Sequence, residues 1–160
     1  MQARLNYNFR GIAIVDGIHS ANKSLCDRCF HPICSDYSTL TCQDFTPALK
    51  FKALIGFDNE RFNTFRVGAA WSKRLKVGSL VAIVNAKTDE VFTHCRVTEV
   101  YFGEKMQMAE IHGKFNHSIQ TLNITDNIAT QMLKRLKNSS GTMIYNSSST
   151  VSVIYLEKIK

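Results

Sequence analysis

The chain has 160 residues, of which 44% are hydrophobic and 21% charged, and it carries a formal net charge of +7 at pH 7. A chain of this length can bury roughly 70% of its unfolded surface around one core, and its aromatic content excludes wholesale disorder. No apolar run approaches the roughly 18 residues of a membrane-spanning helix, and the first residues lack the basic-then-apolar layout of a secretory signal. We therefore expect a cytoplasmic protein that does not enter a membrane.

The excess of basic residues favours an anionic partner. Nucleic acid is the commonest such partner for a basic domain of this size. The basic residues form two small clusters: Lys73, Arg74 and Lys76, and Lys134, Arg135 and Lys137. The alternative is that both clusters are solvated faces that keep the protein soluble.

The N-terminal part of the chain divides into a short strand and a long polar segment. Residues 11–15 form an apolar run closed by Asp16-Gly17, which predicts a buried strand followed by a turn. Residues 17–46 show little periodic hydrophobicity and hold four of the five cysteines. A loop of this length inside a compact domain needs something else to order it.

The cysteine spacing C-x2-C-x4-C-x7-C predicts a structural zinc site. Zinc takes about four thiolate or imidazole ligands in a tetrahedron, and a Cys-x-x-Cys turn presents two thiolates to one ion. The predicted ligands are Cys26, Cys29, Cys34 and Cys42, and His31 or His19 is the alternative for one of them. Four protein ligands leave no open position, so such a metal would not be catalytic.

Other interpretations of the same cysteines stay open. They include buried cysteines without a metal, and disulfides, which a cytoplasmic chain disfavours. Redox chemistry at the Cys26 and Cys29 pair is a further alternative.

From residue 48 onward the hydrophobic pattern becomes regular. Residues 48–57 predict a short strand that runs into a helical turn, and residues 61–66 predict a polar, basic turn. Two strands are expected over residues 80–84 and 91–102, joined by a hairpin loop. Cys95 alternates with apolar neighbours in the second of them, so we expect it in the core.

A helix is expected near the C-terminal end of the chain. Thr125-Asp126 predicts its N-cap, and its cationic end near Lys137 suits the helix dipole. Its apolar stripe consists of Ile128, Met132, Leu133 and Leu136. Residues 138–141 are expected to stop it.

One or two helical turns over residues 106–112 and a last strand over residues 151–156 complete the expected elements. Strands and helices mixed in this way indicate an α+β fold. We expect one compact unit over residues 48–160, preceded by a strand and a cysteine-rich segment over residues 1–47.

Five short motifs stand in an order that is similar to that of a known family. They are Leu-Lys-Phe at 49–51, Thr-x-Arg at 64–66, Lys-x-Gly-Ser-Leu-Val-Ala-Ile at 76–83, Cys-Arg-Val-Thr-Glu-Val at 95–100 and Val-Ile-Tyr-Leu-Glu-Lys-Ile at 153–159. This order resembles the ASCH domain, one of the PUA-like β-barrels. The resemblance covers about residues 48–160 and implies a small barrel with flanking helices, to which the cysteine-rich segment is an insertion.

Members of the ASCH family carry a turn Gly-x-Lys-Thr-x-Thr-x-Arg that lines a cleft facing nucleic acid or a nucleoside. Thr64 and Arg66 keep the second Thr and the closing Arg of this motif. Asn59, Arg61 and Phe62 stand at the Gly, Lys and first Thr positions.

The departures from the motif bear on catalysis. ASCH enzymes that hydrolyse N4-acetylcytidine use the Lys and the second Thr together with a downstream Glu. Arg61 stays protonated and cannot act as a base. Glu110 is the only acidic residue between Lys105 and Thr125, so no well-placed carboxylate is evident. The resemblance therefore implies binding rather than hydrolysis.

We predict a nucleic-acid-binding module that prefers RNA or single-stranded nucleic acid to duplex DNA. The two arginines of the turn suit bidentate bonds to phosphate, and the Asn and Thr between them suit a base edge or sugar. The tryptophan offers a stacking face, and the basic residues after it extend a positive rim. The predicted binding residues are Arg61, Asn63, Thr64, Arg66, Trp71, Lys73, Arg74 and Lys76.

Alternatives to this function stay open. Arg66 is alternatively a structural partner of Glu90 or Glu99, and Trp71 a partly buried packing residue. The chain as a whole is alternatively an amidohydrolase acting on a modified nucleoside such as N4-acetylcytidine, or a phage-type regulator whose basic face binds an acidic host protein.

Overall fold

The computed structural model describes residues 5–7, 13–15, 48–88 and 90–159. The predicted zinc ligands lie outside the described residues, as do His19 and His31, so the zinc site and the boundary after residue 47 stay predictions. The chain divides into two compact units, one of residues 1–53, 80–95 and 159 and one of residues 54–79, 96–158 and 160.

The first unit contains two pairs of strands. β1 (Leu5–Tyr7) and β2 (Ala13–Val15) pair antiparallel, so the strand expected at residues 11–15 is confirmed over its described part. β3 (Ala48–Phe51) and β5 (Leu80–Asn85) pair in parallel, with Ala48 opposite Ala82. The residues after β3 form turns and bends in place of the predicted helical turn. The apolar run of β5 is buried throughout its middle, as is usual for a strand covered on both faces.

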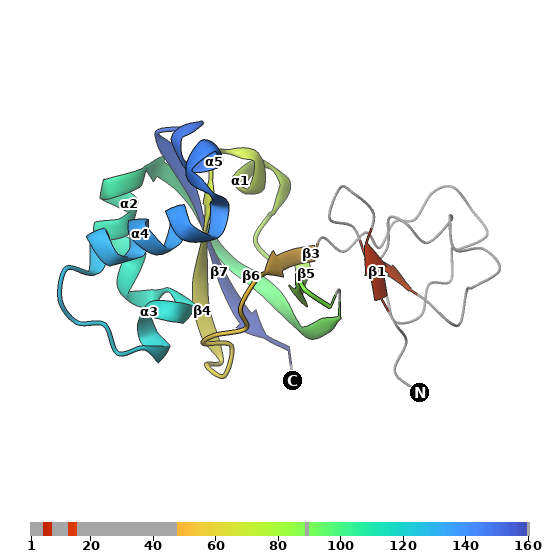
Figure 1. Cartoon of the computed structure of the whole chain (residues 1–160). Coiled ribbons are helices and arrows are strands. Elements are labelled where there is room, and N and C mark those ends of the chain that lie inside the picture. The colour runs from red at the N-terminus through yellow and green to blue at the C-terminus, as the bar shows by residue number, and fades with distance from the viewer. Residues whose placement is uncertain (1–4, 8–12, 16–47, 89, 160) are drawn as a thin grey trace. The chain divides into compact units, whose positions relative to one another are not determined.

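A five-stranded sheet has the strand order β3-β5-β6-β7-β4. Its other strands are β4 (Arg61–Val67), β6 (Val91–Glu104) and β7 (Thr150–Lys158). The sheet is curled and flanked by helices, which confirms the predicted α+β class (Figure 1). Cys95 on β6 is fully buried, as predicted.

The turn predicted at residues 61–66 is wrong, because these residues form β4. This strand pairs antiparallel with β7 from Arg61 opposite Glu157 to Val67 opposite Val151. Its middle residues, Phe62 to Phe65, are buried on both faces of the sheet. The polar residues Asn63 and Thr64 led to the prediction of a turn. A polar residue can nevertheless be buried inside a strand when its polar groups form hydrogen bonds.

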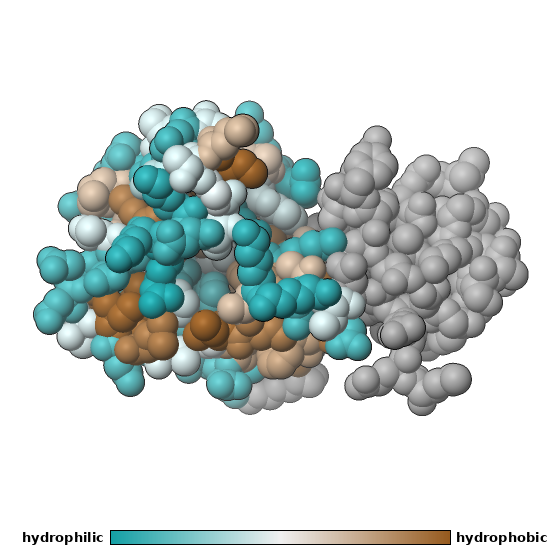
Figure 2. All heavy atoms as spheres, in the orientation of Figure 1, coloured by the Kyte–Doolittle hydropathy of each residue, from teal (hydrophilic) through white to brown (hydrophobic). Residues whose placement is uncertain are grey.

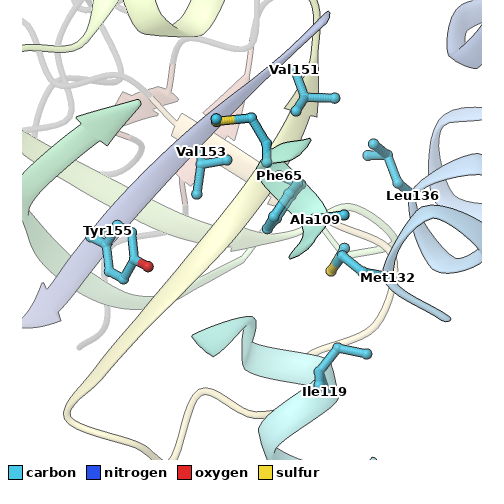
Figure 3. Close-up of a cluster of buried hydrophobic side chains, with 9 residues drawn as sticks. Phe65, Ala109, Ile119, Met132, Leu136, Val151, Val153 and Tyr155 are labelled. Atoms are coloured by element: carbon cyan, nitrogen blue, oxygen red, sulfur yellow. The ribbon is translucent and has the colours of Figure 1, made fainter. Parts of the chain in front are cut away.

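Helices cover one face of β4 and β7. These helices are α2 (Lys105–His112), the 3-10 turn η2 (Gly113–Phe115), α3 (His117–Thr121) and α4 (Ile128–Ser140). Phe65, Val151 and Val153 point from the two strands toward Met132 and Leu136 of α4 (Figure 3). This contact confirms the apolar stripe predicted for α4, and it forms the core of the second unit.

The ends of α4 differ from the prediction. The helix starts after Asn127, which adopts a left-handed conformation with φ 51°, and no side chain caps it. The predicted cap at Thr125-Asp126 is therefore wrong. The helix continues to Ser140 and ends at Gly141, whose φ of 85° suits glycine. Two five-residue helices, α1 (Ala70–Arg74) and α5 (Thr142–Asn146), complete the unit.

The face of the molecule in Figure 2 is mostly hydrophilic, with apolar side chains gathered near α3 and α5. Leu122 at the end of α3 and Met143 and Ile144 of α5 are exposed apolar residues. No helix of the described ranges is long and apolar enough to cross a membrane.

The loop before β4 packs closely against the start of α3. Gly56 has φ +84°, and a Cβ added to it would lie 1.8 Å from the carbonyl oxygen of His117. The Nδ1–H of His117 donates to the carbonyl oxygen of Ile55 at 2.6 Å, and the imidazole stacks on Phe57 with centroids 4.6 Å apart. Only glycine fits at position 56.

Gly56→Ala should therefore destabilise the protein strongly. We expect a loss of at least about 3 kcal/mol in the free energy of unfolding, because a methyl group there meets backbone as well as a strained φ. Gly78→Ala is the matched control, since Gly78 has φ +92° but open space around it, and it should cost only about 1 kcal/mol. Urea unfolding of both variants measures the difference. Equal losses would show that Gly56 matters only for its backbone conformation.

His117 should make the stability depend on pH. Burial, reinforced by the charges of Arg66 and Arg135, lowers the pKa of His117 from 6.5 to about 4, against the opposing effect of the Ile55 hydrogen bond. Between these values the unfolded chain binds more protons, so stability falls as pH is lowered through this window, by up to about 3 kcal/mol. His117→Gln should be less stable at pH 7 but lose less on acidification. Urea unfolding at pH 7, 5.5 and 4 checks this, and an unchanged pH dependence in the variant would contradict it.

Candidate functional site

The predicted binding residues separate into two groups along β4. Side chains alternate between the faces of a strand, so Arg61 and Asn63 lie on the face covered by helices and Thr64 and Arg66 on the other. Five steps of about 3.3 Å put Arg61 and Arg66 about 17 Å apart along the strand. The two arginines therefore do not form one site.

The first group is the Trp71 cluster, which consists of Arg66, Trp71 and Arg74. The guanidinium carbon of Arg74 lies 4.7 Å from the centroid of the Trp71 ring, and that of Arg66 lies 5.9 Å from it. These distances are typical of cation–π contacts. Trp71 thus contacts two cations, whereas the sequence predicted a stacking platform for bases.

Hydrogen bonds fix the Trp71 cluster to the sheet. The Ser72 amide donates to the hydroxyl oxygen of Ser152 on β7 at 3.2 Å. That hydroxyl in turn donates to the carbonyl oxygen of Gly68 at 2.6 Å. The short helix α1 therefore has a set position beside β7, and its aromatic ring is held in place.

The electrostatic character of the Trp71 cluster is positive. Burial lowers the pKa of Arg66 from 12.5 to about 10, so Arg66 stays charged at neutral pH. Arg74 is exposed, as are the neighbouring Lys73 and Lys76. All four predicted cations of this segment are thus close together in the sequence, and three of them face solvent.

The second group is the Glu99 cluster, which consists of Arg61, Glu99, Tyr101, His112 and Tyr155. Arg61 of β4 forms an ion pair with Glu99 of β6, and the Tyr101 hydroxyl donates to the other carboxylate oxygen. The side chains of Arg61 and Glu99 are 55% and 37% exposed. The carboxylate neutralises the arginine that was predicted to bind phosphate.

Aromatic rings form the rest of the Glu99 cluster. Tyr101 stacks on His112, with centroids 4.4 Å apart and planes at 29°. His112 Nδ1 lies 2.8 Å from the hydroxyl oxygen of Tyr155. Tyr101 is 39% exposed, whereas His112 and Tyr155 are buried beneath it. The exposed ring of Phe115 lies 6.1 Å from that of Tyr155.

Burial and hydrogen bonding keep these groups uncharged at neutral pH. Burial lowers the pKa of His112, against the opposing charge of Glu99. The hydrogen bond to Glu99 raises the pKa of Tyr101, and burial raises that of Tyr155. The cluster therefore presents one ion pair, a neutral imidazole and two neutral phenols.

Asn63 lies beneath the cluster and is fully buried. Its side-chain Nδ2 donates to the backbone carbonyl oxygen of His112 at 2.9 Å. The backbone carbonyl oxygen of Asn63 accepts from Asn116 Nδ2 at 3.3 Å. Because Nδ2 is the donor, the orientation of the amide is fixed and Oδ1 is an acceptor. Within the described ranges, Oδ1 has no hydrogen-bond partner.

The structure places two predicted residues where a ligand does not reach them. Asn63 is buried, and Thr64 is 2% exposed and lies opposite Ile154 on the face away from Arg61. A hydrolytic role for Thr64 together with Arg61 has no support in this geometry.

Sequence reasoning named Glu99 only as an alternative partner of Arg66, and it missed Tyr101, His112 and Tyr155 as residues of the site. The sequence analysis looked for a carboxylate only between Lys105 and Thr125 and found none that was well placed. The structure corrects this conclusion, because Glu99 lies beside Arg61. A signal was present, because the alternation of β6 puts Glu99 on the face shared with the buried Cys95 and Val97. In the described part of the chain, no group of three or more His, Cys, Asp or Glu residues could hold a metal ion.

No family model matches the chain, and no curated protein matches it. Among solved structures it is similar to a mutant of the ZmASCH protein from Zymomonas mobilis, with a TM-score of 0.46 and 7% identity over 71% of this chain and 70% of that one. It is also similar to a protein from Enterococcus faecalis, with a TM-score of 0.45 and 11% identity over 64% and 63%. An ASCH domain from Lactobacillus crispatus gives a TM-score of 0.37 and 11% identity over 64% and 67%. Likenesses at this level assign no function.

Proposed function

We propose that this chain is a nucleic-acid-binding module that holds the phosphate backbone of RNA or other single-stranded nucleic acid at the Trp71 cluster. The placement of two guanidinium groups near one indole ring carries the proposal. The Arg66 and Arg74 guanidinium carbons lie 5.9 and 4.7 Å from the Trp71 centroid. Two positive charges around one ring raise the local potential for an anion, and a guanidinium binds phosphate through parallel N–H donors.

The contacts with Trp71 also reduce the entropic cost of binding. A long cationic side chain loses rotamer freedom when it grips a phosphate. Stacking on the indole limits that freedom before the ligand arrives. Trp71 therefore acts as a positioning residue for phosphate contacts.

The wider charge distribution supports the same partner. Lys73 and Lys76 are exposed beside Arg74, and the chain carries a net charge of +7. The order of motifs that resembles the ASCH domain supports nucleic acid as the class of ligand. Phosphate contacts alone do not distinguish bases, so we expect binding at the Trp71 cluster to be independent of the nucleotide sequence.

Binding is better supported than hydrolysis of a modified nucleoside. Glu99 does supply a carboxylate beside Arg61, which favours the hydrolase as the second candidate. However, a guanidinium does not act as a base, and Thr64 is buried on the opposite face of β4.

Removing two exposed cations of this segment should weaken binding in a salt-dependent manner. We expect Arg74→Ala combined with Lys76→Ala to lower the affinity for a single-stranded RNA. The slope of log Kobs against log salt should become shallower by about 1.4, since each phosphate contact on a single strand contributes about 0.7. Fluorescence anisotropy with a labelled RNA from 50 to 300 mM salt measures both quantities.

Lys134→Ala combined with Lys137→Ala is the matched control, because it removes the same charge from exposed positions on α4. The control should keep the wild-type slope. If both double variants change the slope equally, the site is not at the Trp71 cluster. If the wild type shows no salt-dependent binding to RNA or DNA, the proposed function is wrong.

We also propose that Cys26, Cys29, Cys34 and Cys42 hold a structural zinc ion. The spacing of the four thiols supports this proposal. A closed site of this kind stabilises the local chain and supplies no reactive metal position.

Metal analysis tests the zinc proposal directly. We expect about one zinc per chain in the purified protein and a clear loss in Cys29→Ser. Cys95→Ala is the control, because Cys95 is buried in β6 and should not affect the zinc content. Less than about one zinc per wild-type chain, or equal losses in the two variants, would overturn the four-cysteine site.

A further inference from the structure

We propose that the Glu99 cluster is a base-recognition site, which takes an unpaired nucleobase bearing an exocyclic amino group. The base stacks on the outer face of Tyr101 and donates its amino N–H to the carboxylate of Glu99. The inference rests on the proposed function, because the nucleobase belongs to the strand whose phosphates contact the Trp71 cluster.

The charge of the Glu99 cluster separates it from a phosphate site. The ion pair with Glu99 already neutralises Arg61, and the other members of the cluster carry no charge. The carboxylate at its centre repels phosphate oxygens. A neutral, planar ligand with hydrogen-bond donors fits these surroundings.

Tyr101 provides a stacking surface of the kind that single-stranded ligands use. One face of its ring rests on His112 at 4.4 Å, and the residue is 39% exposed, so the opposite face is open to solvent. The His112 imidazole and its contact with Tyr155 support the ring from below. A rigid, half-exposed aromatic ring of this sort gains roughly 1 to 3 kcal/mol from stacking with a base.

Glu99 determines which base is preferred. Its oxygens accept from Arg61 and Tyr101, yet an ionised carboxylate has about four acceptor positions, so about two stay open. Both open positions accept hydrogen bonds and neither donates. Adenine and cytosine present amino donors to such a group. Uracil presents only its N3–H, and the two exocyclic oxygens on either side of that donor repel the carboxylate.

Binding of three labelled RNA homopolymers of equal length tests this inference. Oligo(rA), oligo(rC) and oligo(rU) are titrated with the full chain by fluorescence anisotropy at one salt concentration. We expect the wild type to bind oligo(rA) and oligo(rC) at least about tenfold more tightly than oligo(rU).

Two variants and a control complete the test. Glu99→Gln keeps the shape of the side chain but replaces one acceptor by a donor, so the preference should fall to within about threefold. Tyr101→Ala should lower the binding of oligo(rA) and oligo(rC) to the level of oligo(rU). Glu110→Gln removes the same charge from an exposed position on α2 and should keep the wild-type preference. Circular dichroism confirms that each variant is folded.

The outcomes distinguish this inference from the proposed function. Equal, salt-dependent binding of all three homopolymers by the wild type would overturn base recognition and leave the proposed function standing. A preference that survives in Glu99→Gln and Tyr101→Ala would place base recognition elsewhere. Absence of binding to every homopolymer would overturn both.

Discussion

The antiparallel pairing of β4 with β7 is the constraint on which both candidate sites depend. The register from Arg61 opposite Glu157 to Val67 opposite Val151 decides which side chains share a face. A shift of one residue would turn every side chain of β4 to the other face, because side chains alternate along a strand. The core contacts of Phe65 with α4 therefore also fix Arg61 beside Glu99 and Arg66 beside Trp71.

Buried polar groups hold this arrangement in place. Asn63 in the middle of β4 bonds to the end of α2, and Asn116 caps α3 with its side chain while also bonding back to β4. These two amides join the strand to the helices that cover it. Because an unpaired amide in a core is costly, the network resists sliding of the helices over the sheet. The stacked pair of Tyr101 and His112 benefits directly, since His112 is the last residue of α2.

The sequence predicts the elements whose patterns are regular. β5, β6 and β7 follow from apolar runs and alternation, and α4 follows from its stripe, because local periodicity reflects burial on one side or throughout. β4 was not predicted from the sequence, and the reason is physical. Polar Asn63 and Thr64 sit between two phenylalanines, and their burial depends on partners such as His112, which lies 49 positions away.

Contacts between residues distant in the sequence also limit what can be predicted about the two candidate sites. The closeness of Arg66, Trp71 and Arg74 was expected in outline, because the three residues lie within nine positions of one another. The Glu99 cluster was not, because its ion pair joins residues 38 positions apart on strands that are not adjacent in the sheet. β7 lies between β4 and β6 and contributes Tyr155, so only the strand order reveals which residues meet. Local sequence also suggested one role for both arginines of the motif, whereas their partners differ.

The different partners of the two arginines imply a division of labour. Arg66 lies near the Trp71 ring, which Arg74 also contacts, so its charge adds to the positive potential of this cluster. Arg61 faces a carboxylate, so its charge serves to hold that carboxylate in place for a neutral ligand. The part of β4 between Arg61 and Arg66 is about 17 Å long. An extended single strand rises by roughly 6 Å per nucleotide, which is about twice the 3.4 Å step of one strand in a duplex, so this length corresponds to roughly three nucleotides. One short single strand can therefore satisfy a phosphate contact at one end of β4 and a base contact at the other, provided that it passes around the edge of the sheet. Among the described residues β4 is the outermost strand of the sheet, and Asn116 forms a backbone bridge with Asn63 at its outer edge, so such a path has to pass outside the Asn116 segment.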